Sequence, residues 1–333
     1  MPFALRVSLP VDLLPPLDRV RDHLEEVFDA RVDLDEDADR ALDRGLRAAS
    51  WCPWPARTLG LFIDGASARG AEVALRRDGD GIEVRTSMHV MGTWTDWRLV
   101  LELSIHLAEQ GDGYCTLQGG GRVATSNLRA RYLEDPTHYE RELLAGLDAI
   151  ERSVEQGRIV RLGGPRGTAA VGPRTWPALA EHEDPDERAE AIIELILSSL
   201  GAEGFEDYYP ANLLCLDGRT GREVLASLLP PDKDTLLRDP EFVLLSANLE
   251  AGPEEPLFVL PFERLADAFP GRLRWLDDCT VAIPAIPRSE WASHVARLRP
   301  MLTPLHELLD GPPEDGDPDA WRRFVDDDGA QPR

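Results

Sequence analysis

Two glycine-rich turns that contain arginine are the parts of this sequence best suited to chemistry. The first spans residues 118–122 and the second spans residues 163–168. Glycine lets backbone N–H groups approach an anion, and arginine binds phosphate or carboxylate through two parallel hydrogen bonds. The anion-binding residues predicted from these two turns and the strand before the second are Gly120, Gly121, Arg122, Arg161 and Arg166.

The charge pattern around both turns supports this prediction. The chain carries a net charge of −25, yet residues 113–133 and 157–180 contain arginines and no acidic residue. A predicted helix of about 20 residues, about 30 Å long, separates the two segments. The strand predicted at 158–162 can run back along that helix and bring the second turn toward the first segment. The two segments could then form one shared anion site. The alternative is two exposed loops whose arginines pair with the protein's own carboxylates.

Familiar catalytic and metal-binding motifs are missing from the sequence. No Gly-Lys pair exists for a nucleotide phosphate loop, and there is no HExxH or GxSxG. The acidic run 33–39 lacks the glycine and glutamate that a calcium loop needs, so these acids are expected to begin a helix. Cys115 is expected to be a buried strand residue. The alternative is a cysteine nucleophile that pairs in space with a histidine distant in the sequence. We therefore predict no metal, no cofactor and no catalytic residue.

The segment Trp51-Cys52-Pro53-Trp54-Pro55 is the best candidate for contact with another protein. Tryptophan is favoured in binding hot spots, and the flanking prolines restrict the backbone at low entropic cost. Trp51 and Trp54 are accordingly the predicted contact residues. The alternative is that both indoles cover the edge of the hydrophobic core.

The composition limits the partners and the location. With 61 acidic and 36 basic residues, the chain is not expected to bind nucleic acid, whereas a basic protein partner is compatible. The four cysteines are widely spaced, so neither a zinc knuckle nor a disulfide framework is expected. The sequence offers no apolar run long enough to cross a membrane and no typical signal peptide, so a cytoplasmic location is predicted.

The elements that must position these residues alternate without a regular β-α-β rhythm. Asp78-Gly79-Asp80-Gly81 predicts a hairpin between two strands, and the long apolar stretch 95–110 predicts a buried helix that ends near Gly111. The fold class predicted is therefore α+β, with two mixed domains and mainly antiparallel sheets flanked by helices. The predicted boundaries are an N-terminal domain at 1–162, a Gly/Pro-rich linker at 163–183, a C-terminal domain at 184–310 and an acidic tail at 311–333.

The function predicted from these features is a cytoplasmic, non-catalytic protein-binding module. An immunity or antidote protein, or an accessory factor, of a bacterial toxin, secretion or defence system is the form of this role that we expect. The alternative is a phosphate-ligand-binding protein or enzyme that uses the loops around Arg122 and Arg166. The two differ in one spatial feature, which is whether the arginines meet in a concave pocket.

Overall fold

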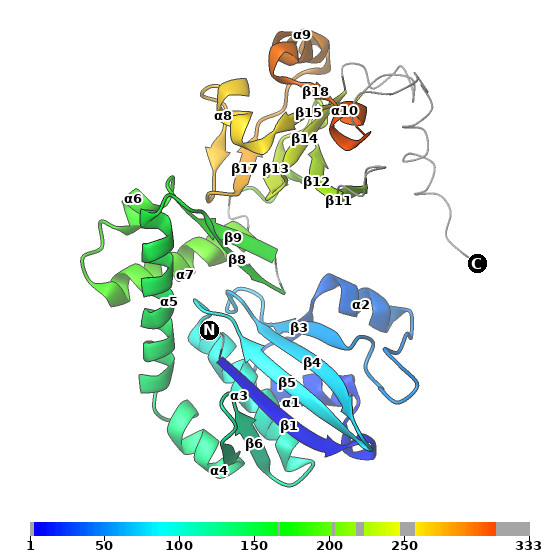
Figure 1. Ribbon diagram of the computed structural model, residues 1–333, viewed down its shortest axis with the longest axis vertical. Helices are drawn as coiled ribbons and strands as arrows, with labels where there is room; N and C mark the ends of the chain where they lie inside the picture. Colours follow the sequence, from blue (N-terminus) through cyan, green and yellow to red (C-terminus); the bar gives the residue numbers. More distant parts are fainter. Residues whose placement is uncertain (1–2, 166, 202–203, 218–222, 247–256, 311–333) are drawn as a thin grey trace. The chain divides into compact units, whose positions relative to one another are not determined.

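The chain folds into two compact units, Met1–Gly201 and Ala202–Arg333. The structure is a computed structural model, and it describes residues 3–165, 167–201, 204–217, 223–246 and 257–310 (Figure 1). Helices and antiparallel or mixed sheets occur in both units, which confirms the α+β class predicted from the sequence. None of the described helices is long and apolar enough to cross a membrane.

The first unit is built on a seven-stranded antiparallel sheet with the order β2-β3-β4-β5-β1-β6-β7. The predicted hairpin is present, since Asp78 pairs with Gly81 and Gly79 takes the positive φ of +59° that a two-residue turn requires. The strands are β1 (Phe3–Pro10), β2 (Asp33–Leu34), β3 (Thr58–Phe62), β4 (Ala71–Asp78), β5 (Gly81–Met88), β6 (Tyr114–Leu117) and β7 (Arg122–Ala124).

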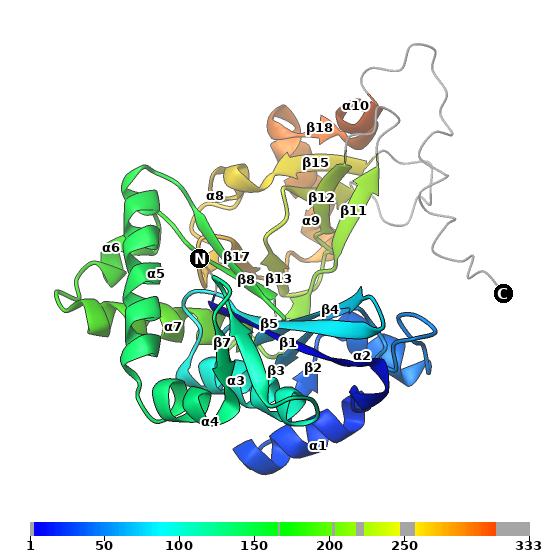
Figure 2. The same ribbon diagram turned by 60° about the horizontal axis from the view of Figure 1, so that its bottom comes forward.

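Helix α3 (Trp94–Glu109) packs on this sheet and forms the centre of the main hydrophobic core. Apolar side chains on most of its surface are buried. The helix contacts β1, β5 and α1 (Leu17–Phe28), and the ribbons of these elements can be followed in Figure 2. Thr93 caps the helix, and its side chain and that of Asp96 form a reciprocal capping box. The short helix α2 (Glu36–Asp43) begins at its N-cap, Asp35, next to strand β3. The acids at its start therefore lie in the first helical turn, as the sequence predicts.

A second layer of the first unit contains helices and a two-stranded hairpin. Its core joins the hairpin, α5 and α7 to the main body through Ala68 and Met91. Its elements are α4 (Thr125–Leu128), a π-helical turn (Arg129–Leu133), α5 (Thr137–Glu155), β8 (Val160–Gly164), β9 (Gly167–Val171), α6 (Trp176–Leu179) and α7 (Pro185–Gly201).

The structure divides the chain at a different place from the linker predicted at 163–183. Strand β9 and helix α6 lie within this predicted linker, and α7 packs on α5 and β9. Ala169, Ala170 and Val171 are fully buried, so the segment belongs to the core of the first unit. Its glycines and prolines resemble a linker in composition, but they serve a hairpin that packs closely on its neighbours.

The second unit contains two sheets, a four-stranded one with the order β10-β13-β17-β16 and a five-stranded one with the order β11-β12-β14-β15-β18. Near the end of the described chain, Pro300 and Pro304 separate two helices, α9 (Arg288–Leu298) and α10 (Leu305–Asp310). The remaining elements are β10 (Tyr209–Pro210), β11 (Leu213–Asp217), β12 (Glu223–Leu228), β13 (Thr235–Arg238), β14 (Phe242–Ser246), β15 (Leu257–Pro261), α8 (Leu265–Ala268), β16 (Arg274–Trp275), β17 (Thr280–Ile283) and β18 (Thr303–Pro304). The acidic tail predicted at 311–333 lies outside the described residues.

Candidate functional site

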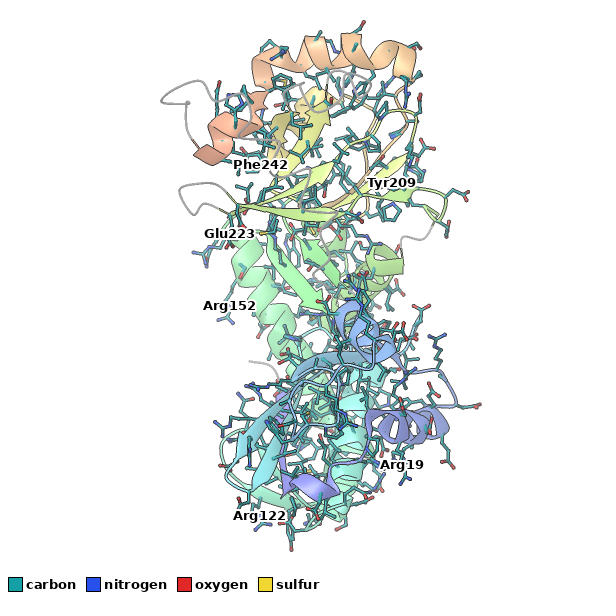
Figure 3. All side chains as sticks on the ribbon, turned by 90° about the vertical axis from the view of Figure 1, so that its right-hand side faces the viewer. Arg19, Arg122, Arg152, Tyr209, Glu223 and Phe242 are labelled. Carbon is teal, nitrogen blue, oxygen red and sulfur yellow. The ribbon has the colours of Figure 1, made fainter. Side chains whose placement is uncertain are left out.

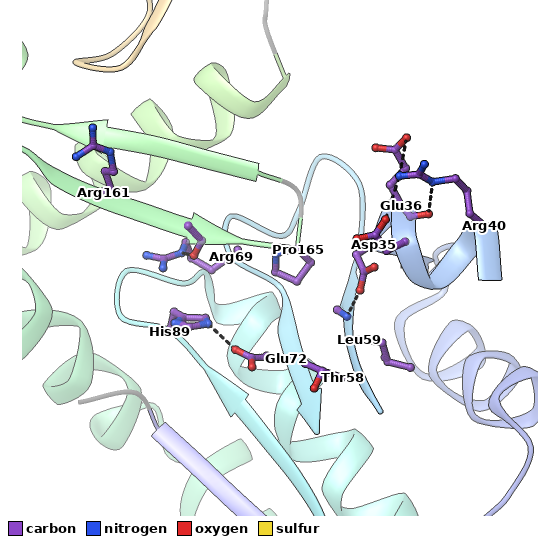
Figure 4. A pocket seen from close by; sticks show the side chains of 14 residues that line it. Asp35, Glu36, Arg40, Thr58, Leu59, Arg69, Glu72, His89, Arg161 and Pro165 are labelled. Atoms are coloured by element: carbon purple, nitrogen blue, oxygen red, sulfur yellow. Dashed lines mark hydrogen bonds and ion pairs between the residues drawn. The ribbon is translucent and has the colours of Figure 1, made fainter. Parts of the chain in front are cut away.

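A cleft of about 700 Å³ lies within the first unit, between the β8–β9 hairpin and the region of α2, β3 and β4 (Figure 4). Its lining is mainly polar and includes basic and acidic side chains. The basic residues Arg69, His89 and Arg161 lie toward one end in Figure 4, whereas Asp35 and Glu36 lie toward the other.

Glycines allow the hairpin to approach the sheet closely enough to form this cleft. A Cβ atom on Gly60 would overlap the ring of Pro165 at the hairpin tip, and one on Gly164 would lie 2.5 Å from the carbonyl oxygen of Arg69. Backbone atoms cannot move away as easily as a flexible side chain can. Glycine at these positions therefore fixes the width of the cleft.

Arg69 connects the two walls of the cleft. Its side chain donates from Nε to the carbonyl of Gly163 at 2.6 Å and from Nη1 to the carbonyl of Val90 at 2.8 Å. The residue is only 4% exposed, and burial lowers the pKa of its guanidinium to about 10, although nearby Asp96 opposes this shift. Among the described residues, no carboxylate lies within ion-pair distance of Arg69. The site thus contains a buried cation that is hydrogen-bonded to carbonyl groups.

Asp96 holds the backbone of Arg69 in place. Its fully buried carboxylate accepts hydrogen bonds from the backbone N–H groups of Ala68, Arg69 and Gly70 at 2.9–3.1 Å, and from that of Thr93 at 2.8 Å. One carboxylate therefore satisfies four donors that would otherwise be buried without a partner. This arrangement fixes the loop before β4 against the start of α3.

The remaining polar groups of the cleft are held by local pairs. His89 Nε2 lies 3.0 Å from the Glu72 carboxylate, so the two side chains fix each other at the floor of the cleft. On the far wall, Arg40 pairs with Glu36 and Asp37 at 3.5 and 3.0 Å. Arg40 is thus neutralised within its own helix, in contrast to Arg69.

The structure does not bring Arg122 and Arg161 together. Arg161 lies on β8 and lines the cleft. Arg122 lies on β7, at the opposite edge of the sheet from β2 and β3, and it is labelled in Figure 3. There its guanidinium pairs with Asp112 at 2.6 Å and lies 4.5 Å from the centre of the Tyr114 ring.

The other predicted anion-binding residues separate in the same way. Gly120, with a φ of +95°, and Gly121 form the turn before β7, and no atom surrounds the positions where their Cβ atoms would lie. This turn is open and distant from the cleft in the order of the sheet. Arg166, the fifth predicted anion-binding residue, lies outside the described residues.

The two predicted contact tryptophans have different environments. Trp54 is fully buried, and its indole N–H donates to the carbonyl of Pro15 at 2.8 Å. Trp54 therefore offers no surface to a partner in this structure. Its position agrees with the alternative prediction, in which the indole belongs to the hydrophobic core. Trp51 is half-buried, and the Arg57 guanidinium lies 5.8 Å from its ring centre.

Cys115 lies in β6 and is fully buried, as expected for a strand residue of the core. Its Sγ lies 3.6 Å from the carbonyl oxygen of Ser104. Burial, together with Asp112 and Glu109, raises the pKa of the thiol to about 12. A catalytic cysteine needs its thiolate, and this environment disfavours that form.

Sequence reasoning missed Arg69, Asp96 and His89. The one signal that pointed to Asp96 is the spacing Thr93-Trp94-Thr95-Asp96, which matches a capping box in which aspartate replaces the usual glutamate. Nothing local marks Arg69, because its partner Gly163 is 94 residues away. Comparisons with known protein families, with curated proteins and with solved structures gave no match for this chain. The functional proposal therefore rests on the chemistry of the site.

Proposed function

We propose that the first unit binds a small anionic ligand, with a phosphate or carboxylate group, in the cleft beside the β8–β9 hairpin. The observation that carries this proposal is Arg69, which lines the cleft at 4% exposure with carbonyl partners and no described carboxylate within ion-pair distance. A buried charge is costly unless another charge or several hydrogen bonds compensate it. A ligand anion at this end of the cleft would add a direct ion-pair partner to the carbonyl hydrogen bonds and the nearby charge of Asp96.

Arg161 and His89 extend the same basic end of the cleft. Arg161 on β8 is exposed and lines the cleft. Arginine is suited to phosphate and carboxylate groups because its guanidinium can donate two parallel hydrogen bonds. His89 is oriented by Glu72 at the floor. In a chain with a net charge of −25, a local group of arginines such as Arg69 and Arg161 is needed for an anion to bind.

Acidic groups on the far wall favour a ligand that also carries hydroxyl or amino groups. Glu36 and Asp37 line the cleft and pair with Arg40. A carboxylate can accept more than one hydrogen bond, so both can also accept from a ligand. Asp35 accepts from the backbone N–H groups of Ala38 and Gly60. A sugar phosphate or nucleotide, as in the predicted alternative function, presents both an anion and hydroxyl groups.

Thermal unfolding with added inorganic phosphate, a sugar phosphate or a nucleotide tests the proposal. A ligand at about 100 times its Kd should raise Tm by about 5 °C. Arg161→Ala should remove most of this shift because it deletes the exposed cation of the cleft. Arg122→Ala is the matched control, since it deletes an arginine from the other turn, and it should leave the shift unchanged. Equal loss in both variants, or no shift with any of these ligands, would contradict the proposal.

Protein binding, the role predicted first from the sequence, is a second candidate function. The observation that favours it is a row of exposed apolar side chains on β11 and β12 of the second unit. An immunity, antidote or accessory role would be a special form of this function, and it stays a prediction until a partner is identified.

A further inference from the structure

Strand β11 differs from every other described edge of the three larger sheets. The three larger sheets have six edge strands. Five of them contain two or three residues, whereas β11 contains five. Short edges are one of the devices by which proteins prevent unwanted strand pairing, and charged or proline residues are others. Arg122 lies on β7 and Pro304 on β18, for example. The outer edge of β11 is therefore the longest backbone template that these sheets present.

The sequence of β11 makes this edge unusually apolar. Leu213, Leu214 and Cys215 are all exposed, at 47% and 36% for the two leucines, and no charge interrupts the strand before Asp217. Its neighbour β12 adds Leu225, which lies directly opposite Cys215 and is 37% exposed. Consecutive residues point to opposite faces, so apolar surface is exposed on both faces of the edge.

Two carboxylates lie close together at the far end of the same edge. Asp217 pairs directly with Glu223, and like charges in this position repel each other. Ligand atoms of Cys215, Asp217 and Glu223 all lie within 4.8 Å of one another. No described lysine or arginine lies within ion-pair distance of either carboxylate. Arg219 and Arg222, which stand between these two acids in the sequence, lie outside the described residues.

We propose that β11 binds an extended segment of a basic partner protein by strand addition. The segment would pair its backbone with the outer edge of β11 and place apolar side chains against the exposed leucines. A lysine or arginine of the partner would lie beside Asp217 and Glu223 and relieve their repulsion. This inference rests on the second candidate function, protein binding, and it is independent of the anion cleft in the first unit.

Two synthetic strand peptides test the proposal on the full chain. Both alternate valine and threonine, and one ends in two lysines whereas the other ends in two glutamates. Fluorescence anisotropy measures their affinity, and amide hydrogen exchange shows where they bind. The lysine peptide should bind more tightly and slow the exchange of β11.

A charge reversal supplies the matched comparison. The double variant Asp217→Lys/Glu223→Lys should weaken binding of the lysine peptide by roughly tenfold and improve binding of the glutamate peptide. The control Glu290→Lys/Glu307→Lys changes the net charge equally at exposed positions on α9 and α10, and it should leave both affinities unchanged.

The outcomes separate the partner chemistry from protein binding itself. If both peptides protect β11 equally, the basic partner is wrong but strand addition stands. If neither protects β11, strand addition at this edge is wrong, and protein binding loses its structural support. Slow exchange of β11 in the chain alone would overturn the proposal, because the edge would then already be covered. Sedimentation would then show whether a second copy or the chain itself covers it.

Discussion

The turn before β7 and the β8–β9 hairpin are both rich in glycine and arginine and free of acidic residues, but their surroundings differ. The glycines before β7 face open space, and Arg122 is neutralised by Asp112 at the surface. In the hairpin, Gly164 lies against the backbone of Arg69, and Arg161 lines a cleft together with the buried Arg69. The same residue types thus form an ordinary surface turn in one place and one wall of a candidate site in the other.

The difference shows that the surrounding structure decides which arginine is available for a ligand. A surface ion pair such as that of Arg122 contributes little to stability and satisfies the cation locally. Arg69 is instead buried, and its guanidinium donates to two backbone carbonyl groups rather than to a carboxylate. Three pairs of variants test how far the two regions differ.

The largest expected difference in the free energy of unfolding concerns Asp96 beside the cleft and Asp112 beside the turn before β7. Asp96→Asn should lower the free energy of unfolding by about 3 kcal/mol, because an amide cannot accept all four backbone N–H bonds and leaves a buried donor unsatisfied. Asp112→Asn should change it by less than about 1 kcal/mol, since it removes only an exposed pair. Urea unfolding measures both. Equal effects would mean that the cleft region is no more tightly organised than the surface turn.

The next difference concerns the glycines. Gly164→Ala should cost about 1–3 kcal/mol, because the new Cβ would meet the carbonyl oxygen of Arg69 and push the hairpin away. Gly121→Ala should cost less than about 0.5 kcal/mol, since nothing lies within 4 Å of its Cβ position. Chemical denaturation gives both values. A Gly164→Ala protein with unchanged stability would show that the hairpin does not need its close approach.

The smallest effect concerns acid stability at the end of α3 remote from Asp96. His106 stacks on His23 with ring centres 4.0 Å apart, and burial, with His23 second, lowers its pKa to about 4. His106 gains a proton near pH 6.5 in the unfolded chain but only near pH 4 in the folded chain. Protonation of His106 therefore favours the unfolded chain, so the free energy of unfolding is highest above about pH 6.5 and decreases as the pH falls toward 4.

Tm measured between pH 7 and pH 4 tests this prediction. His106→Gln should flatten the acid side of the profile, whereas His182→Gln, at an exposed position, should leave its shape unchanged. Hydrogen exchange at pH 5 should increase first where α1 meets α3, before the β8–β9 hairpin responds. Earlier loss of the hairpin would show that the cleft is the weaker region.

Much of the secondary structure could be predicted from local pattern. The hairpin at Asp78–Gly81, the buried helix α3 and the interruption between α9 and α10 each follow from turn residues, apolar periodicity or proline within a short window. The predicted linker failed to capture the hairpin because glycine and proline mark both flexible connections and close packing. The apolar pattern of α3 also gave no sign of its ion pair, in which the buried Glu102 lies 2.9 Å from Arg129.

The sequence by itself determined the α+β class, the acidic character of the chain and the local turns, since these depend on composition and on residues a few positions apart. Only the tertiary structure decided that Arg161 lines a cleft while Arg122 meets Asp112, and that Trp54 is buried. The physical reason is that these outcomes depend on contacts between distant segments. The hydrogen bond from Arg69 to Gly163 spans 94 residues, and no local pattern encodes such a contact.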